Sequence, residues 1–199
     1  MSYNILNFIK MKNIVFVFIA LLLWGCSSSQ KKQNGEGAID STKVVSQAIF
    51  PDWSQNAVIY EVNVRQFTPE GTFEAFSKHL PRLKEMGVDI LWFMPIYPIS
   101  EKNRKGTLGS YYSISDYKAV NPEFGSLEDF KAVVDQAHNL GMKVILDWVA
   151  NHTGWDGPWI ENHPEWFTQD SLGNIVSPVE DWSDVADLNY DVPEMRTAM

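Results

Sequence analysis

Three apolar segments, each followed by polar and aromatic residues, dominate the chain beyond residue 50. The first, 58–67, is rich in β-branched and aromatic residues, the second, 88–94, is closed by a proline, and the third, 142–149, is mostly apolar. Residues of these types fit the pleated, half-buried surface of a sheet. We therefore predict three strands, over residues 58–67, 88–94 and 142–149.

Between these strands, apolar residues recur at the spacing of a helix. Pro81 lies inside the first helical stretch and removes one backbone hydrogen bond, which predicts a kink or a split there. Ser126 and Asp129 predict a capping-box start for the second helix, and Gly87 and Gly141 stand where helix ends are expected. The apolar positions are Phe73, Phe76, Leu80, Leu83 and Met86, then Phe130, Val133, Val134, Ala137 and Leu140.

Strands that are apolar on both faces and alternate with helices are typical of an α/β protein with a parallel sheet. Longer polar segments follow the strands, and in a parallel barrel these loops build the active face. Residues 151–190, about forty in all, have no strong period and form a predicted excursion or small subdomain. A complete eightfold barrel needs about 250 residues. We expect the N-terminal three β/α units of a TIM (β/α)8 barrel plus this excursion, with the barrel incomplete.

Residues 1–26 have the pattern of an export signal. Two lysines precede an apolar run, 14–25, that is too short to span a bilayer of roughly 30 Å comfortably. The run ends at Cys26, the single cysteine, and residues 23–26 resemble a bacterial lipoprotein cleavage box except that Trp24 replaces a small residue. We expect a protein exported to the periplasm or cell surface and lipid-anchored to the membrane through Cys26. A plain signal anchor with a buried cysteine is the alternative.

Residues 27–50 are rich in Ser, Lys, Gln and Gly and predict a flexible tether, although a terminal tail without a role has the same composition. Residues 51–199 then form the predicted partial barrel. The net charge of −9 argues against a nucleic-acid partner, since phosphate binding needs a basic surface.

Polar side chains gather at the end of the third predicted strand. Asp147, Asn151 and His152 offer a carboxylate, an amide and an imidazole, which can bind hydroxyl groups or a metal. On chemistry alone, Asp147 is a candidate glycosidase carboxylate that needs a partner, or else a member of a satisfied hydrogen-bond network. His79 and His138 are expected on the surface or in packing, and His163 has no motif around it. Lys102, Arg104 and Lys105 are expected in a solvated loop.

Five segments in order, within residues 53–199, resemble motifs of the α-amylase family (glycoside hydrolase family 13). They are Gly109-Ser-Tyr-Tyr-Ser-Ile-Ser-Asp-Tyr117, Asn121-Pro-Glu-Phe-Gly125, Ala137-His-Asn-Leu-Gly141, Asp147-x-Val-x-Asn-His152 and Asp187-Leu-Asn189.

The resemblance implies a role for each matching residue. Tyr112 would stack on the sugar that undergoes cleavage, and His152 would hydrogen-bond a hydroxyl of the same sugar. Asp147 would support an arginine near the nucleophile and would not itself attack, which replaces the interpretation from chemistry alone. Asn151 and Asp187 would be calcium ligands, although not every family member binds the ion here. No organic cofactor is implied. The four tryptophans of the excursion are expected either to pack it or to stack on sugars.

The resemblance further implies an exported glycoside hydrolase that acts on α-glucosidic linkages of starch-like glucans or maltooligosaccharides by a retaining mechanism. The family's catalytic carboxylates follow later strands, and its Gly-Phe-Arg-x-Asp motif is absent from the sequence. We therefore expect this polypeptide to be an N-terminal fragment that is inactive alone. The alternatives are a non-catalytic sugar-binding lipoprotein with an amylase-like remnant and a transporter-associated protein, which would carry a full membrane-spanning helix.

Overall fold

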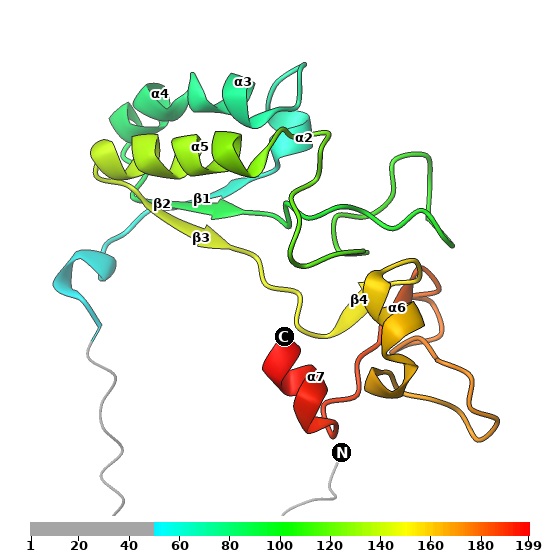
Figure 1. Cartoon of the computed structure of the whole chain (residues 1–199). Helices are drawn as coiled ribbons and strands as arrows, with labels where there is room; N and C mark the ends of the chain where they lie inside the picture. The colour runs from blue at the N-terminus through cyan, green and yellow to red at the C-terminus, as the bar shows by residue number, and fades with distance from the viewer. Residues whose placement is uncertain (1–49) are drawn as a thin grey trace, which may run out of the picture. The chain divides into compact units, whose positions relative to one another are not determined.

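The computed structural model describes residues 50–199 (Figure 1). The predicted export signal with its lipidation site Cys26, and nearly all of the predicted tether, lie outside the described residues. Within the described part, no helix is both long enough and apolar enough to cross a membrane.

Three short parallel strands form a sheet in the order β1-β2-β3. They are β1 (Ile59–Val62), β2 (Ile90–Phe93) and β3 (Lys143–Leu146), and β2 pairs with both neighbours. Tyr60 stands opposite Leu91, which stands opposite Val144. The predicted parallel sheet is confirmed, and each strand is shorter than its predicted segment.

The chain after β1 is the clearest departure from the predicted strand 58–67. The strand ends at Val62, and one helical turn, α2 (Val64–Phe67), follows. The turn buries Val64, which is 3% exposed. It also places the Phe67 ring edge-to-face on Phe76, with the centroids 4.9 Å apart. Burial of these two apolar side chains therefore outweighs the strand preference of the segment.

The helices follow the sequence signals closely. The first stretch is split into α3 (Phe73–Ser77) and α4 (Leu80–Glu85), with Pro81 in the first turn of α4. The second is α5 (Leu127–Asn139). The Asp129 backbone N–H donates to the Ser126 hydroxyl at 3.1 Å, and Asp129 Oδ2 accepts from the Ser126 N–H at 2.8 Å. The predicted split and capping box are both confirmed.

Helices α3, α4 and α5 cover one face of the sheet (Figure 1). Phe93 is fully buried there, with its ring edge-to-face on Phe76 and on Phe130. Side chains alternate between the faces of a strand, and those on the other face remain accessible. Ile59, Trp92 and Ile145 are 55%, 37% and 45% exposed. The described strands are thus apolar on both faces but buried on one.

The excursion (residues 151–190) contains short elements and its own core. Its strands β4 (His152–Gly154) and β5 (Val185–Asp187) pair antiparallel. Between them lie α6 (Pro158–Asn162) and the 3-10 helix η2 (Pro164–Trp166), and α7 (Pro193–Ala198) follows. A further 3-10 helix, η1 (Asp52–Ser54), precedes β1. The buried cluster of the excursion and α7 comprises Trp166, Phe167, Ala186, Leu188 and Met195.

Candidate active site

Tyr112 and Asp147 meet beyond the carboxyl ends of the strands. Tyr112 belongs to the long loop after β2, and Asp147 is the first residue after β3, where its N–H donates to the carbonyl of Phe93 at 2.9 Å. The Tyr112 hydroxyl donates to Asp147 Oδ2 at 2.9 Å. Burial, together with this hydrogen bond, raises the pKa of Tyr112 to about 12. The phenol therefore remains a proton donor across the neutral range.

His152 opens β4 and is 6% exposed. Its Nε2 lies 3.0 Å from the carbonyl oxygen of Tyr112, which can only accept, so Nε2 carries a proton. Its Nδ1 lies 2.8 Å from the side-chain nitrogen of Asn151, which donates to it. Burial lowers the pKa of His152 from its ordinary value. Both ring nitrogens of the neutral imidazole are thus engaged within the chain, and a sugar hydroxyl would have to share Nε2–H with the Tyr112 carbonyl.

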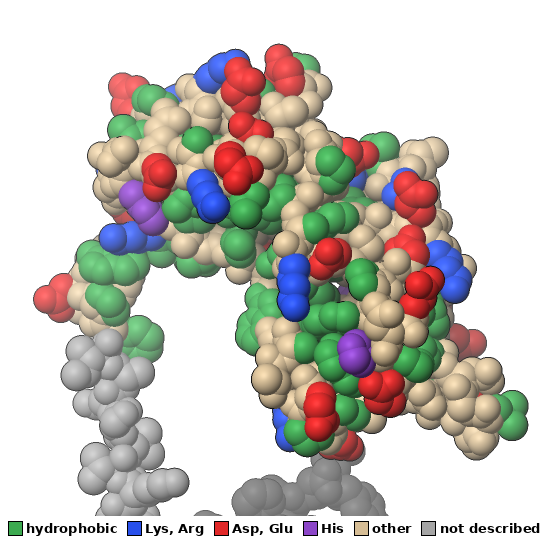
Figure 2. Space-filling model, viewed as in Figure 1, with side chains coloured by type: hydrophobic (Ala, Val, Ile, Leu, Met, Phe, Trp, Pro, Cys, Tyr) green, Lys and Arg blue, Asp and Glu red, His purple; other side chains and the backbone are tan. Residues whose placement is uncertain are grey.

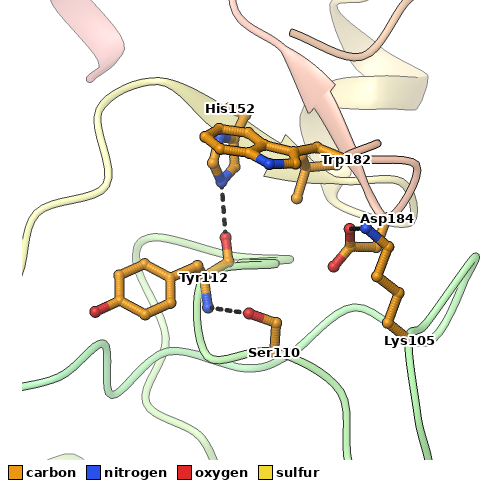
Figure 3. A pocket seen from close by; sticks show the side chains of 7 residues that line it. Lys105, Ser110, Tyr112, His152, Trp182 and Asp184 are labelled. Carbon is orange, nitrogen blue, oxygen red and sulfur yellow. Dashed lines mark hydrogen bonds and ion pairs between the residues drawn. The ribbon is translucent and has the colours of Figure 1, made fainter. Parts of the chain in front are cut away.

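A pocket of about 370 Å³ lies between the loop after β2 and the excursion (Figure 3). Tyr112 and Ser110 line it from the loop after β2, and His152 and Trp182 line it from the excursion. The volume falls within the range of small-molecule sites. The remaining lining residues are Lys105, Asp184 and Val185.

Several hydrogen bonds tie the loop after β2 to the excursion on one side of the pocket. The Asp156 carboxylate accepts from the backbone N–H groups of Glu101 and Lys102 at 2.7 and 3.0 Å. Burial acts to raise the pKa of Asp156, but these hydrogen bonds and one from Ser100 hold it below its usual value. Gly154 N–H donates to the Ile114 carbonyl at 2.6 Å. The pocket is therefore bounded by two segments that hold each other.

Lys105 is exposed in the loop after β2, as expected from the sequence, and it also contacts the excursion. Its Nζ lies 3.1 Å from Asp184 Oδ1 and donates to the carbonyl of Asp181. Arg104 is partly buried and donates to the Ser100 carbonyl at 3.1 Å. The sequence could not reveal the two contacts of Lys105, because they join segments more than seventy residues apart.

The two predicted calcium ligands lie at the same end of the β4–β5 ladder. Asn151 immediately precedes His152, and His152 stands opposite Asp187. The amide nitrogen of Asn151 is engaged by His152, which leaves its oxygen for a cation. Calcium takes six to eight oxygen ligands, and in residues 50–199 no three or more His, Cys, Asp or Glu side chains gather to hold a metal. The pair alone is an incomplete donor set, and carbonyl oxygens or water would have to complete it.

The five predicted site residues lie around the pocket and at one end of the β4–β5 ladder: Tyr112, Asp147, Asn151, His152 and Asp187. The other lining residues were not predicted as site residues. Ser110 stands inside a quoted motif, and Trp182 was one of four tryptophans with no feature to distinguish it. For Asp184 no sequence signal was available.

A sequence profile described as the alpha-amylase catalytic domain matches residues 28–198. The chain belongs to the alpha-amylase family. It is 40% identical over 139 residues to a trehalose synthase of Thermus thermophilus. The aligned region covers 66% of this chain and 12% of the relative. It is 34% identical over 181 residues to an alpha-1,4-glucan:maltose-1-phosphate maltosyltransferase of Rhodospirillum rubrum. That aligned region covers 80% of this chain and 26% of the maltosyltransferase.

The fold agrees with this family membership. A crystal structure of an alpha-amylase from Lactobacillus plantarum superposes with a TM-score of 0.71 at 52% identity, covering 72% of this chain and 34% of the other. The parallel sheet and its helices therefore form part of an alpha-amylase barrel. The chain spans about a third of the length of the solved amylase and less of the curated relatives.

Proposed function

We propose that this protein acts on α-glucosidic linkages of starch-like glucans or maltooligosaccharides, with a retaining mechanism, and that residues 51–199 supply three β/α units and one sugar-binding wall of its barrel. The observation that carries the proposal is the meeting of Tyr112, Asp147 and His152 beside a pocket at the strand ends. Membership in the alpha-amylase family supports it, since one of the relatives named above is an alpha-1,4-glucan:maltose-1-phosphate maltosyltransferase.

In this proposal, one glucose ring of the substrate lies against Tyr112 and His152. The ring of Tyr112 is held by its hydroxyl bond to Asp147, so its orientation is set before the sugar arrives. The Nε2–H of neutral His152 donates a hydrogen bond to a sugar hydroxyl in addition to the Tyr112 carbonyl. Asp147 acts as a support for Tyr112 and for a cationic group of the complete site, because its carboxylate is already accepting from the phenol.

Two carboxylates lie at this site, Asp184 in the lining of the pocket and Asp147 behind Tyr112, and each has a partner. A retaining glycosidase needs two carboxyl groups about 5–5.5 Å apart, one to attack and one to protonate the leaving oxygen. Asp147 accepts from Tyr112, and Asp184 pairs with Lys105. We infer that the 199-residue chain binds glucans without cleaving them, and that the catalytic carboxylates belong to other strands of the complete barrel. The same engagement of Asp147 and Asp184 favours a second candidate, a non-catalytic sugar-binding lipoprotein.

Steady-state kinetics on the product of the natural gene separate the two candidates. With maltoheptaose as substrate, the enzyme hypothesis predicts turnover, and Tyr112→Ala or His152→Ala should lower kcat/KM by about a hundredfold through misplacement of the sugar. His138→Ala, on the exposed side of α5, is the matched control and should leave the rate unchanged. Binding of maltoheptaose with no turnover by that gene product would leave only the non-catalytic candidate. Cleavage by the 199-residue chain alone would contradict its proposed inactivity.

We also propose a calcium ion at Asn151 and Asp187. Asn151 directly precedes β4, Asp187 ends the neighbouring β5, and their side-chain oxygen atoms accept no hydrogen bond from other described side chains, which supports this. A bound ion stabilises the folded state in proportion to the logarithm of its concentration. Thermal melts should therefore rise as calcium is added after chelation, and Asp187→Asn should remove that rise. Equal melting temperatures in EDTA and in excess calcium would refute the site.

Export and lipid anchoring complete the proposal. They rest on the apolar run before Cys26 and on the position of that cysteine. Incorporation of labelled palmitate into the natural protein, and its loss in Cys26→Ala, would support an anchor. A labelled band that persists in Cys26→Ala would refute it.

A further inference from the structure

We propose that Trp182 and the Lys105–Asp184 ion pair form a second sugar-binding position beside that of Tyr112 and His152, so that the pocket recognises two linked, uncharged pyranose rings. This inference rests on the proposed function, because it takes an α-glucan as the ligand.

Trp182 lines the pocket and is more exposed than a tryptophan that packs in a core. Its side chain is 47% exposed, whereas Trp166 in the core of the excursion is 9% exposed. Its indole meets the His152 ring edge-to-face, with centroids 5.7 Å apart and an angle of 75° between the planes. Figure 3 shows the indole beside His152, on the side of the space that faces Tyr112 and Ser110. An accessible aromatic face held next to the first sugar position suits the apolar face of an adjoining pyranose ring.

The ion pair supplies hydrogen-bonding groups at the pocket edge. Lys105 Nζ is held by Asp184 Oδ1 at 3.1 Å and by the Asp181 carbonyl, while half of its side chain remains exposed. An ammonium group has three donors, so one remains for a ligand. The second carboxylate oxygen of Asp184 accepts no hydrogen bond from the residues that the structure describes. Sugar hydroxyls both donate and accept, and they can use both groups.

The charges favour a neutral sugar over a phosphorylated one. The ammonium of Lys105 is neutralised by Asp184, and the chain as a whole carries a net charge of −9. On the face shown in Figure 2, Lys and Arg side chains are scattered among Asp and Glu. Among the residues that line the pocket, no cation without an acidic partner is therefore left to hold a phosphate. We expect maltose to bind at least as tightly as maltose 1-phosphate.

Titration calorimetry with glucose, maltose and maltose 1-phosphate tests the proposal on the full chain. Trp182→Ala should weaken maltose binding roughly fivefold to tenfold, which is the scale of a lost aromatic contact, and should change glucose binding less than twofold. Lys105→Met should likewise reduce the advantage of maltose over glucose. Trp53→Ala is the matched control. Trp53 has a similar exposure of 52%, but its ring lies over Lys143 at the amino end of β3, away from the pocket.

The outcomes distinguish failure of the second sugar position from failure of the proposed function. If wild-type protein binds neither glucose nor maltose, the proposed function and the second position both fail. If it binds maltose and Trp182→Ala leaves the affinity unchanged, or lowers glucose and maltose binding equally, only the second position fails. Tighter binding of maltose 1-phosphate would overturn the neutral-ligand argument.

A measurement on wild-type protein guards against a Trp182→Ala variant that does not fold. The indole N–H signal of Trp182, assigned by its absence in Trp182→Phe, should shift when maltose is added. The Trp53 signal should stay in place. An unmoved Trp182 signal at saturating maltose would overturn the second sugar position.

Discussion

The β/α layer and the excursion are stabilised by different interactions, although the loop after β2 and the excursion line the same pocket. The layer has a contiguous apolar core of aliphatic side chains and edge-to-face phenylalanines under three helices. The excursion has elements of only three to five residues around a small aromatic cluster. Its conformation therefore depends on hydrogen bonds to the loop after β2 as much as on its own packing. Tyr112 and Asp147 follow strands of the β/α layer, whereas His152 and Trp182 belong to the excursion.

The largest test of this contrast removes one aromatic side chain from each core. Phe93→Ala, at 0% exposure between Phe76 and Phe130, should cost about 3–5 kcal/mol of global stability. Phe167→Ala, at 1% exposure in the excursion, should instead increase hydrogen exchange chiefly within residues 151–190. Equal loss of protection throughout the chain in both variants would show that the two regions unfold as one.

A smaller effect is expected where the two regions touch. A Cβ at Gly154 would lie 2.2 Å from the Cβ of Ser100, so Gly154→Ala must push the excursion away from the loop after β2. Overpacking of this kind costs about 1–3 kcal/mol, and maltose affinity should fall with it. Gly87→Ala is the control, since it introduces a side chain at φ 89° with no atom within 4 Å. Thermal melts and calorimetry would contradict the idea if Gly87→Ala alone weakened maltose binding.

The smallest expected effect concerns pH. Burial lowers the pKa of His152 below its value in the unfolded chain. The stability linked to its neutral form is therefore present above pH 6.5, and it is lost as the pH falls through the lower folded value. Protonation also makes Nδ1 a donor that opposes the Asn151 amide. The acid sensitivity of hydrogen exchange in the excursion should be reduced in His152→Gln, and an unchanged profile would argue against this account.

Much of the β/α layer could be predicted because its signals are local. The Ser126 capping box, the Pro81 split and the apolar period of α5 each lie within one or a few turns of the chain. The turn α2 was missed because burial of Val64 and Phe67 overrides the strand preference of the segment.

The excursion was predicted from its length and its lack of a strong period, but the pairing of its strands could not be predicted. His152 and Asp187 stand opposite each other across more than thirty residues, and strands of three residues are too short to show alternation. The motif resemblance supplied Tyr112 and His152. Lys105, Trp182 and Asp184 were missed as a group because only the fold brings them to one pocket.

Asp156 and Lys105 each contact residues on the other side of the pocket. Two stretches that are distant in the sequence therefore depend on each other. Asp156 and Asp184 lie in the excursion, while Glu101, Lys102 and Lys105 lie in the loop after β2. A chimaera that grafted only one of these stretches from a relative would separate donors from acceptors. To transfer a substrate preference from a relative, residues 100–110 and 151–190 should therefore be exchanged together. A change in the length of one segment should be accompanied by a change in the length of the other.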